Sequence, residues 1–145
     1  MKTKATLIAI ALIMAVMSLT SCNKTPKEML TGEYAISSIT TDLKMTSEEA
    51  GIWNKAMEDL KKTTTLILQA DGKMQETING VTKKGTWEVL GEEGEEGETL
   101  VLKLIYENKS TVNMTIHDLS SSGFTNTQND EASHTKTVIT YSKTK

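Results

Sequence analysis

The chain has no arginine, and cysteine, proline and aromatic residues are few. The lack of arginine and of cysteine excludes particular classes of structure and function. All 16 basic residues are lysine, so the guanidinium fork that usually reads phosphates and guanine is missing. Because the formal net charge is also negative, at −3, we expect no nucleic-acid binding. The single cysteine, Cys22, excludes an internal disulfide and a cysteine-rich metal site.

Long apolar runs are also absent. The longest extends from Ala5 to Met17, interrupted only by Thr6, and is shorter than the roughly 20 residues of a membrane-spanning helix. Lys2 and Lys4 flank it on one side, and Leu19-Thr20-Ser21-Cys22 follows on the other. This arrangement resembles the lipobox of a bacterial lipoprotein signal peptide. The resemblance implies a signal peptide over residues 1–21 and a Cys22 that carries acyl chains such as palmitate.

A lipidated Cys22 would make the membrane a partner of this protein through the N-terminal lipid. Asn23 follows the cysteine, in place of the aspartate that retains some lipoproteins at the inner membrane. By analogy we expect a lipid-anchored protein of the cell envelope, at the outer membrane. Residues 22–28 are then a short lipidated tether, and residues 29–145 form one domain. Loss of Lys2 and Lys4 with the leader would change the formal charge from −3 to −5.

The first part of the domain predicts a strand followed by a helix. Residues 33–43 read as a strand in which Ile39 breaks the alternation, which predicts a bulge or a register change. Thr46 and Glu49 have the spacing of a capping box. Trp53, Ala56, Met57 and Leu60 then recur at helical spacing, which predicts a helix over residues 46–62. We expect this helix to pack on the rest of the domain through Trp53, Met57 and Leu60.

From residue 63 onward the hydrophobic period changes to two, and short turns such as Asp71-Gly72 and Asn79-Gly80 separate the runs. The expected strands cover residues 63–70, 73–78, 81–90, 99–106, 110–117 and 136–142, with a weak strand that begins at Phe124. Residues 126–133 read as a loop. The pattern predicts an all-β fold, a small antiparallel barrel of about eight strands with one helix inserted after the first strand.

Three short motifs carry a resemblance to a known family. Leu30-Thr31-Gly32-Glu33-Tyr34 opens the domain, and Gly85-Thr86-Trp87-Glu88-Val89 follows a turn with the pattern Leu-x-x-Asp-Gly at residues 68–72. Together these motifs resemble the lipocalin-like domains of small Bacteroidetes lipoproteins, although Tyr34 stands where that family usually has tryptophan. The resemblance covers most of residues 29–142. It implies a lipocalin-like barrel whose mouth binds a small or hydrophobic ligand, and the helix is placed like the lid of fatty-acid-binding barrels.

The candidate ligand-binding residues are large side chains expected to point into the barrel: Tyr34, Trp87, Leu102, Leu104 and Met114. Two alternatives remain open. A cavity lined by these residues would make the protein a binding module. The inward positions Leu66, Leu68, Trp87, Val89, Leu100, Leu102, Leu104, Val112, Met114 and Ile116 are mostly large, however, so the interior of a small barrel can also be filled. Binding would then occur at the end covered by the helix, or the protein would act through its outer surface on an envelope protein.

Groups for catalysis or metal binding are sparse. Five glutamates crowd residues 91–98, which suits either a Ca²⁺ site or a solvated loop, and no Asp-x-Asp pattern favours the metal. His117 lies next to Asp118 but no activated serine motif accompanies it, and His134 is the only other imidazole. We therefore expect no enzyme activity, no cofactor and no metal.

Overall fold

The computed structural model describes residues 24–91 and 100–145, and the expected eight-stranded antiparallel barrel is confirmed. Each strand pairs with the next along the chain, and the last strand pairs with the first to close the barrel. The helices are α2 (Pro26–Leu30) and α3 (Ser47–Thr63), and the strands are β1 (Gly32–Thr41), β2 (Thr65–Leu68), β3 (Lys73–Ile78), β4 (Val81–Leu90), β5 (Leu100–Tyr106), β6 (Thr111–Ser120), β7 (Gly123–Asp130) and β8 (Thr135–Lys143). Cys22 and the glutamates of residues 92–98 lie outside the described residues.

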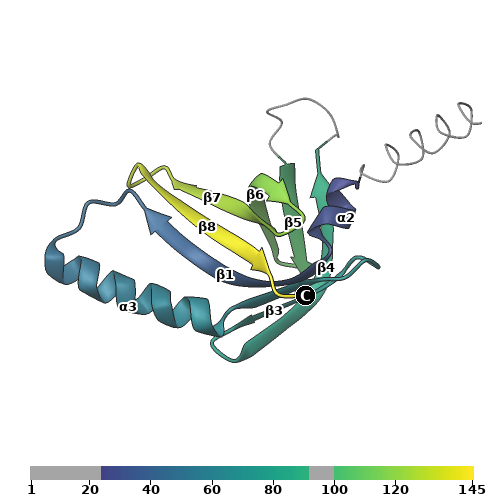
Figure 1. The fold of residues 1–145 in the computed structure, drawn as a ribbon, viewed down its shortest axis with the longest axis horizontal. Coiled ribbons are helices and arrows are strands. Elements are labelled where there is room, and N and C mark those ends of the chain that lie inside the picture. The colour runs from purple at the N-terminus through teal and green to yellow at the C-terminus, as the bar shows by residue number, and fades with distance from the viewer. Residues whose placement is uncertain (1–23, 92–99) are drawn as a thin grey trace, which may run out of the picture.

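The two helices lie at different ends of the barrel (Figure 1). The short α2 leads into the start of β1, and we call this end, where β4 ends at Leu90 and β8 ends at Lys143, the closed end. The long α3 connects the end of β1 to the start of β2. We call that end, where β7 ends at Asp130 and β8 begins at Thr135, the open end.

The core consists of side chains that alternate along the strands and point into the barrel. On β5, for example, Leu102, Leu104 and Tyr106 are buried. The buried apolar cluster comprises Leu30, Tyr34, Ile36, Leu66, Leu68, Met74, Trp87, Leu102, Leu104, Tyr106, Met114, Ile116, Phe124 and Tyr141. Seven of the ten inward positions expected from the sequence belong to it. Val89 and Leu100 are partly buried and pack against it, and Val112 is 42 % exposed because it is the second residue of β6, near the open end.

The predicted tether of residues 22–28 needs correction, because α2 begins within it at Pro26. The Thr25 hydroxyl accepts a hydrogen bond from the Glu28 backbone N–H at 3.2 Å, and the Glu28 carboxylate accepts one from the Thr25 N–H at 2.8 Å. This capping box, with Pro26 at the first helical position, stabilises a helix too short to show hydrophobic periodicity. Leu30 at its end is fully buried and fills the closed end.

Helix α3 forms as predicted, with one difference in its packing. The capping box is present: Glu49 accepts from the Thr46 N–H at 2.7 Å, and the Thr46 hydroxyl accepts from the Glu49 N–H at 3.3 Å. Trp53, Met57 and Leu60 lie on the face toward the barrel, but they are only half-buried, and no residue of the helix is buried. The helix therefore covers the barrel without joining its core.

Strands β1 and β7, which both run to the open end, depart from a regular pattern, β1 in its register and β7 in its polar sequence. The register of β1 against β8 shifts between Ile36 and Ser38, which confirms the expected bulge or register change. The expected loop over residues 126–133 is wrong, because β7 continues to Asp130. The sequence of β7 is polar and does not look like a strand, but β7 pairs with β8 over its whole length.

Candidate functional site

A cleft of about 470 Å³ lies at the open end, between the first turns of α3 and the ends of β1, β7 and β8. Its lining residues are Thr41, Leu43, Trp53, Gln128, Asn129, Asp130, Ser133, Thr135 and Thr137. The volume falls within the roughly 300–1,000 Å³ of small-molecule sites. We call it the mouth cleft.

Strands β7, β8 and β1 place these side chains by register. Opposite residues on antiparallel neighbours share a face, and residues two apart on one strand do so as well. From the closed toward the open end, the three strands present three inward rungs: Phe124–Tyr141–Ile36, Asn126–Ile139–Ile39 and Gln128–Thr137–Thr41. We call them the floor, middle and mouth rungs. All three residues of the mouth rung line the mouth cleft.

The floor rung is apolar and tightly packed. The Phe124 and Tyr141 rings stack with centroids 4.9 Å apart, and Tyr34 meets Phe124 edge-on at 5.1 Å. Burial raises the pKa of Tyr141, and the negative charge of Glu76 raises it further. This aromatic layer lies below the middle rung, which separates it from the mouth cleft.

The rim of the mouth cleft is fixed by hydrogen bonds. The Asp42 carboxylate accepts from the Lys136 N–H at 2.6 Å, and the Asp42 N–H donates to the Lys136 carbonyl at 3.1 Å, which ties the end of β1 to the start of β8. Asp130 accepts from the Ala132 N–H at 2.9 Å. Hydrogen bonds from the Ser133 side chain and from the backbone of Ala132 and Ser133 hold the pKa of Asp130 below its usual value.

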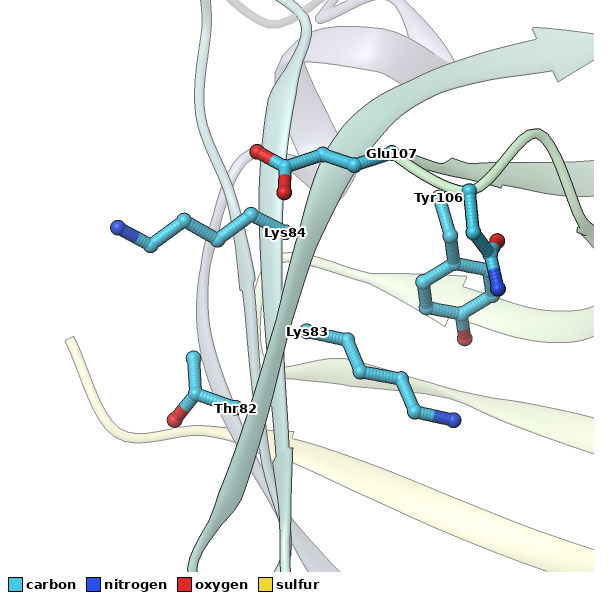
Figure 2. A pocket seen from close by; sticks show the side chains of 6 residues that line it. Thr82, Lys83, Lys84, Tyr106 and Glu107 are labelled. Carbon is cyan, nitrogen blue, oxygen red and sulfur yellow. The ribbon is translucent and has the colours of Figure 1, made fainter.

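A second cleft, of about 350 Å³, lies along β4 and the end of β5. Lys83 and Tyr106 point to one side of the strand, and Thr82 and Lys84 to the other (Figure 2). The Lys83 amine lies 5.6 Å from the centre of the Tyr106 ring, and the Tyr106 hydroxyl donates to Glu76 at 2.7 Å. Burial and this bond to Glu76 raise the pKa of Tyr106. This cleft is smaller than the mouth cleft, and the hydroxyl of its one aromatic residue already has a partner in Glu76, so it is the weaker candidate.

The five sequence-predicted ligand residues lie in the barrel core. Tyr34, Trp87, Leu102, Leu104 and Met114 are between 0 % and 5 % exposed. The Trp87 indole N–H donates to the Gln69 carbonyl at 2.9 Å, and the Tyr34 hydroxyl donates to the Leu30 carbonyl at 2.8 Å. None of the five lines the mouth cleft or the second cleft.

The two histidines are exposed. His134 lies in the turn between β7 and β8 and has a positive φ, whereas His117 lies on β6, next to Asp118, whose φ is positive. The Thr125 hydroxyl is within 3.2 Å of the His117 carbonyl and 3.4 Å of the Asp118 carboxylate. Within residues 24–91 and 100–145, no three histidine, cysteine, aspartate or glutamate side chains are grouped so that they could hold a metal ion.

Sequence reasoning missed the residues of β7 that shape the mouth cleft. Asn126 and Gln128 were assigned to a loop, yet they continue the inward face that begins at Phe124. The alternation Phe124, Asn126, Gln128 is a period-two pattern in which polar residues replace apolar ones. Only the pairing with Ile139 and Thr137 of β8 reveals it.

The fold and the mouth cleft define the class of this protein as a closed antiparallel barrel with a helix over one mouth. Comparison with known proteins adds no family, since no family model and no curated protein matches the chain. In the part of the chain that the structure describes, neither helix has the length and apolar character needed to cross a bilayer.

Proposed function

We propose that this protein is a membrane-anchored lipoprotein whose lipocalin-like barrel binds a small ligand at the mouth covered by α3. The mouth cleft is the observation that carries this proposal. It joins an aromatic side chain, Trp53, to convergent polar groups in a volume suited to a small molecule. The depth of the barrel below it is occupied by buried side chains.

The filled interior supports binding at the mouth over binding inside the barrel. Leu30 fills the closed end, and the floor rung lies beneath the cleft. A ligand that reached Trp87 or Leu102 would have to displace a buried, close-packed core, which costs several kcal/mol. The proposed ligand therefore contacts α3 and the ends of β1, β7 and β8.

The proposed anchor fits this orientation. Three residues separate Cys22 from Pro26, the first residue of α2, so the two Cα atoms are at most about 14 Å apart. Acylation of Cys22 would then hold the closed end near the membrane and direct the open end into the aqueous compartment. Replacement of Cys22 by serine should abolish metabolic labelling with palmitate and leave an unprocessed precursor. Continued labelling of that variant would contradict the anchor.

Fluorescence of the two tryptophans tests the binding site. In a Trp87→Phe protein, Trp53 reports on the mouth cleft, and in a Trp53→Phe protein, Trp87 reports on the core. Saturable quenching of Trp53 alone, by fatty acids, hydrophobic dyes or small neutral solutes, supports binding at the mouth. Saturable quenching of Trp87 would place the ligand in the core and contradict the proposal.

A second candidate function is an interaction with an envelope protein through the outer surface. Exposed apolar side chains favour it: Ile52 on α3 is 67 % exposed, and Val81 at the start of β4 is 61 % exposed. Leu43 and Val112 are exposed near the same end. Absence of any quenching in both tryptophan variants, together with co-purification of one envelope protein that is lost in Ile52→Ser, would favour this candidate.

A further inference from the structure

Asn126 is the most unusual polar residue in the barrel. It is 1 % exposed, and neither its amide nitrogen nor its amide oxygen has a hydrogen-bond partner among the described residues. An unpartnered buried amide is costly, and native proteins usually supply such a group with ordered water or a ligand. The fold does not need an amide here, because the neighbours of Asn126 across the ladder are Ile116 and Ile139.

The register places Asn126 directly below the mouth cleft. Asn126 belongs to the middle rung, and Gln128, the next inward residue of β7 toward the open end, lines the cleft. Thr137 and Thr41 complete the mouth rung above it. Gln128 is exposed and is not packed in the core, so a change of its rotamer would admit one ligand group to the middle rung.

The lining of the mouth cleft selects for a neutral, hydroxylated ligand. Seven of its nine residues are polar, with four hydroxyl side chains, Thr41, Ser133, Thr135 and Thr137, and two amides, Gln128 and Asn129. Among the described residues no lysine lines it, so a carboxylate or phosphate would find no cation in this lining. The one acid, Asp130, is held by the Ala132 and Ser133 N–H groups at 2.9 and 3.4 Å, which makes it part of the rim.

Trp53 supplies the apolar part of the site. It lies opposite the hydroxyl-bearing strands and is half-buried, so part of its indole ring is accessible. A flat aromatic ring on one wall and hydroxyl and amide groups on the other suit a ligand with one apolar face and a polar edge. A pyranose sugar has this chemistry, since its C–H groups gather on one ring face and its hydroxyls point outward.

We propose that the mouth cleft binds a neutral sugar, with one ring face on Trp53 and one hydroxyl paired with the amide of Asn126. This inference rests on the proposed function and specifies the class of ligand. The amide can both donate and accept, and a sugar hydroxyl can do the same, so a single hydroxyl can satisfy both free atoms of Asn126 or share them with one water.

Ligand-observed saturation-transfer NMR on the full chain in detergent tests this inference. The probes are glucose, galactose, mannose, N-acetylglucosamine and the disaccharide maltose, with octanoate as an anionic apolar comparison. We expect at least one sugar to bind with a Kd on the order of 1 mM or tighter. Asn126→Leu should raise the Kd for that sugar by about tenfold or more, the factor that corresponds to the loss of one well-formed hydrogen bond.

Two control variants separate site effects from general ones. Asn113→Leu makes the same change at an exposed position of β6 and should leave sugar binding unchanged. Trp53→Ala should abolish sugar binding, whereas Ile52→Ala, on the solvent side of the same helix, should not alter it. Because these variants change an exposed or half-buried position, a folded protein is expected from each of them.

The outcomes distinguish the inference from the proposed function. Octanoate binding at Trp53 without any sugar binding would overturn the inference and leave a ligand-binding mouth. Sugar binding that Asn126→Leu does not weaken would also overturn it, because the amide would then have no part in recognition. If neither sugars nor octanoate bind, both proposals fail.

Discussion

The two tryptophans of this barrel illustrate how differently its two ends are built. Trp87 is 3 % exposed, its indole N–H is bonded to the Gln69 carbonyl, and Lys27 of α2 lies 5.7 Å from its ring centre. Trp53 is half-buried on a helix with no buried residue, and it lines a cleft. At the closed end, Trp87 is thus part of the core, whereas at the open end Trp53 is partly exposed to solvent.

The same contrast holds for the polar groups at the two ends. At the closed end, the Tyr34 hydroxyl reaches the Leu30 carbonyl, and both residues are fully buried. Toward the open end, the Asn126 amide is almost as deeply buried but has no hydrogen-bond partner in residues 24–91 and 100–145. We therefore expect the closed end, which α2 fills, to contribute most to stability. The Asn126 amide below the mouth can still form hydrogen bonds with a ligand. Variants at the two ends should separate these two properties.

The largest expected effect is at the closed end. Trp87→Ala should lower the free energy of unfolding by about 3–5 kcal/mol, because it leaves a large cavity and removes one of the two hydrogen bonds to the Gln69 carbonyl, the other coming from the Gly72 N–H. Urea denaturation followed by circular dichroism measures this change. A loss below about 1 kcal/mol would show that the closed end is loosely packed and would remove the contrast between the ends.

Alkaline pH should destabilise the protein through its buried tyrosines. Burial raises the pKa of Tyr34 to about 12 from 10.0, so the neutral phenol contributes stability that is complete below pH 10. As the pH rises from 10 toward 12, the unfolded chain releases this proton first, and the contribution is lost at up to about 1.4 kcal/mol per pH unit.

Tyr34→Phe isolates this effect, because the phenylalanine cannot ionise. Its free energy of unfolding, measured in urea across the same pH range, should fall less steeply than that of the unchanged protein. Phenolate absorbance provides the second measurement. A Tyr34 that titrated near pH 10 while the protein stayed folded would show that water enters the closed end.

A smaller effect is expected at the open end. Trp53→Ala should cost about 1–2 kcal/mol, less than a fully buried tryptophan, because its ring keeps part of its solvent contact in the folded state. Ile52→Ala, one residue away and 67 % exposed, serves as the matched control and should change stability by less than about 0.5 kcal/mol. A cost for Trp53→Ala equal to that of Trp87→Ala would mean that α3 belongs to the core.

Much of the fold could be predicted from the sequence because local patterns and tertiary packing agree over most of the chain. The capping box at Thr46, the turn at Asn79-Gly80 and the alternation of β5 each specify their elements without help from distant residues. The helix α2 was missed because five residues are too few to show a period, although Thr25, Pro26 and Glu28 carried its capping pattern.

The candidate site was less predictable, and the reason is physical. The sequence predicts large apolar residues such as Trp87 and Leu104 as ligand contacts, but in this small barrel they fill the interior. The mouth cleft is lined mainly by polar residues such as threonines and amides, which in the sequence resemble loop residues. Gln128 and Thr137 become a site only because β7 and β8 pair them on one inward face.

The smallest expected effect has the opposite sign from the others. Asn126→Leu should raise the free energy of unfolding by about 1 kcal/mol, since it replaces a buried amide without a partner in the described part of the chain by an apolar side chain of similar size. Asn113→Leu, at an exposed position of β6, should leave stability nearly unchanged and serves as the control. Paired urea denaturations of the two variants measure the difference. A loss of stability in Asn126→Leu would show that the amide already has a structural partner, such as an ordered water. A gain would mean that the barrel retains Asn126 at a cost to its own stability, as expected for a residue kept for binding.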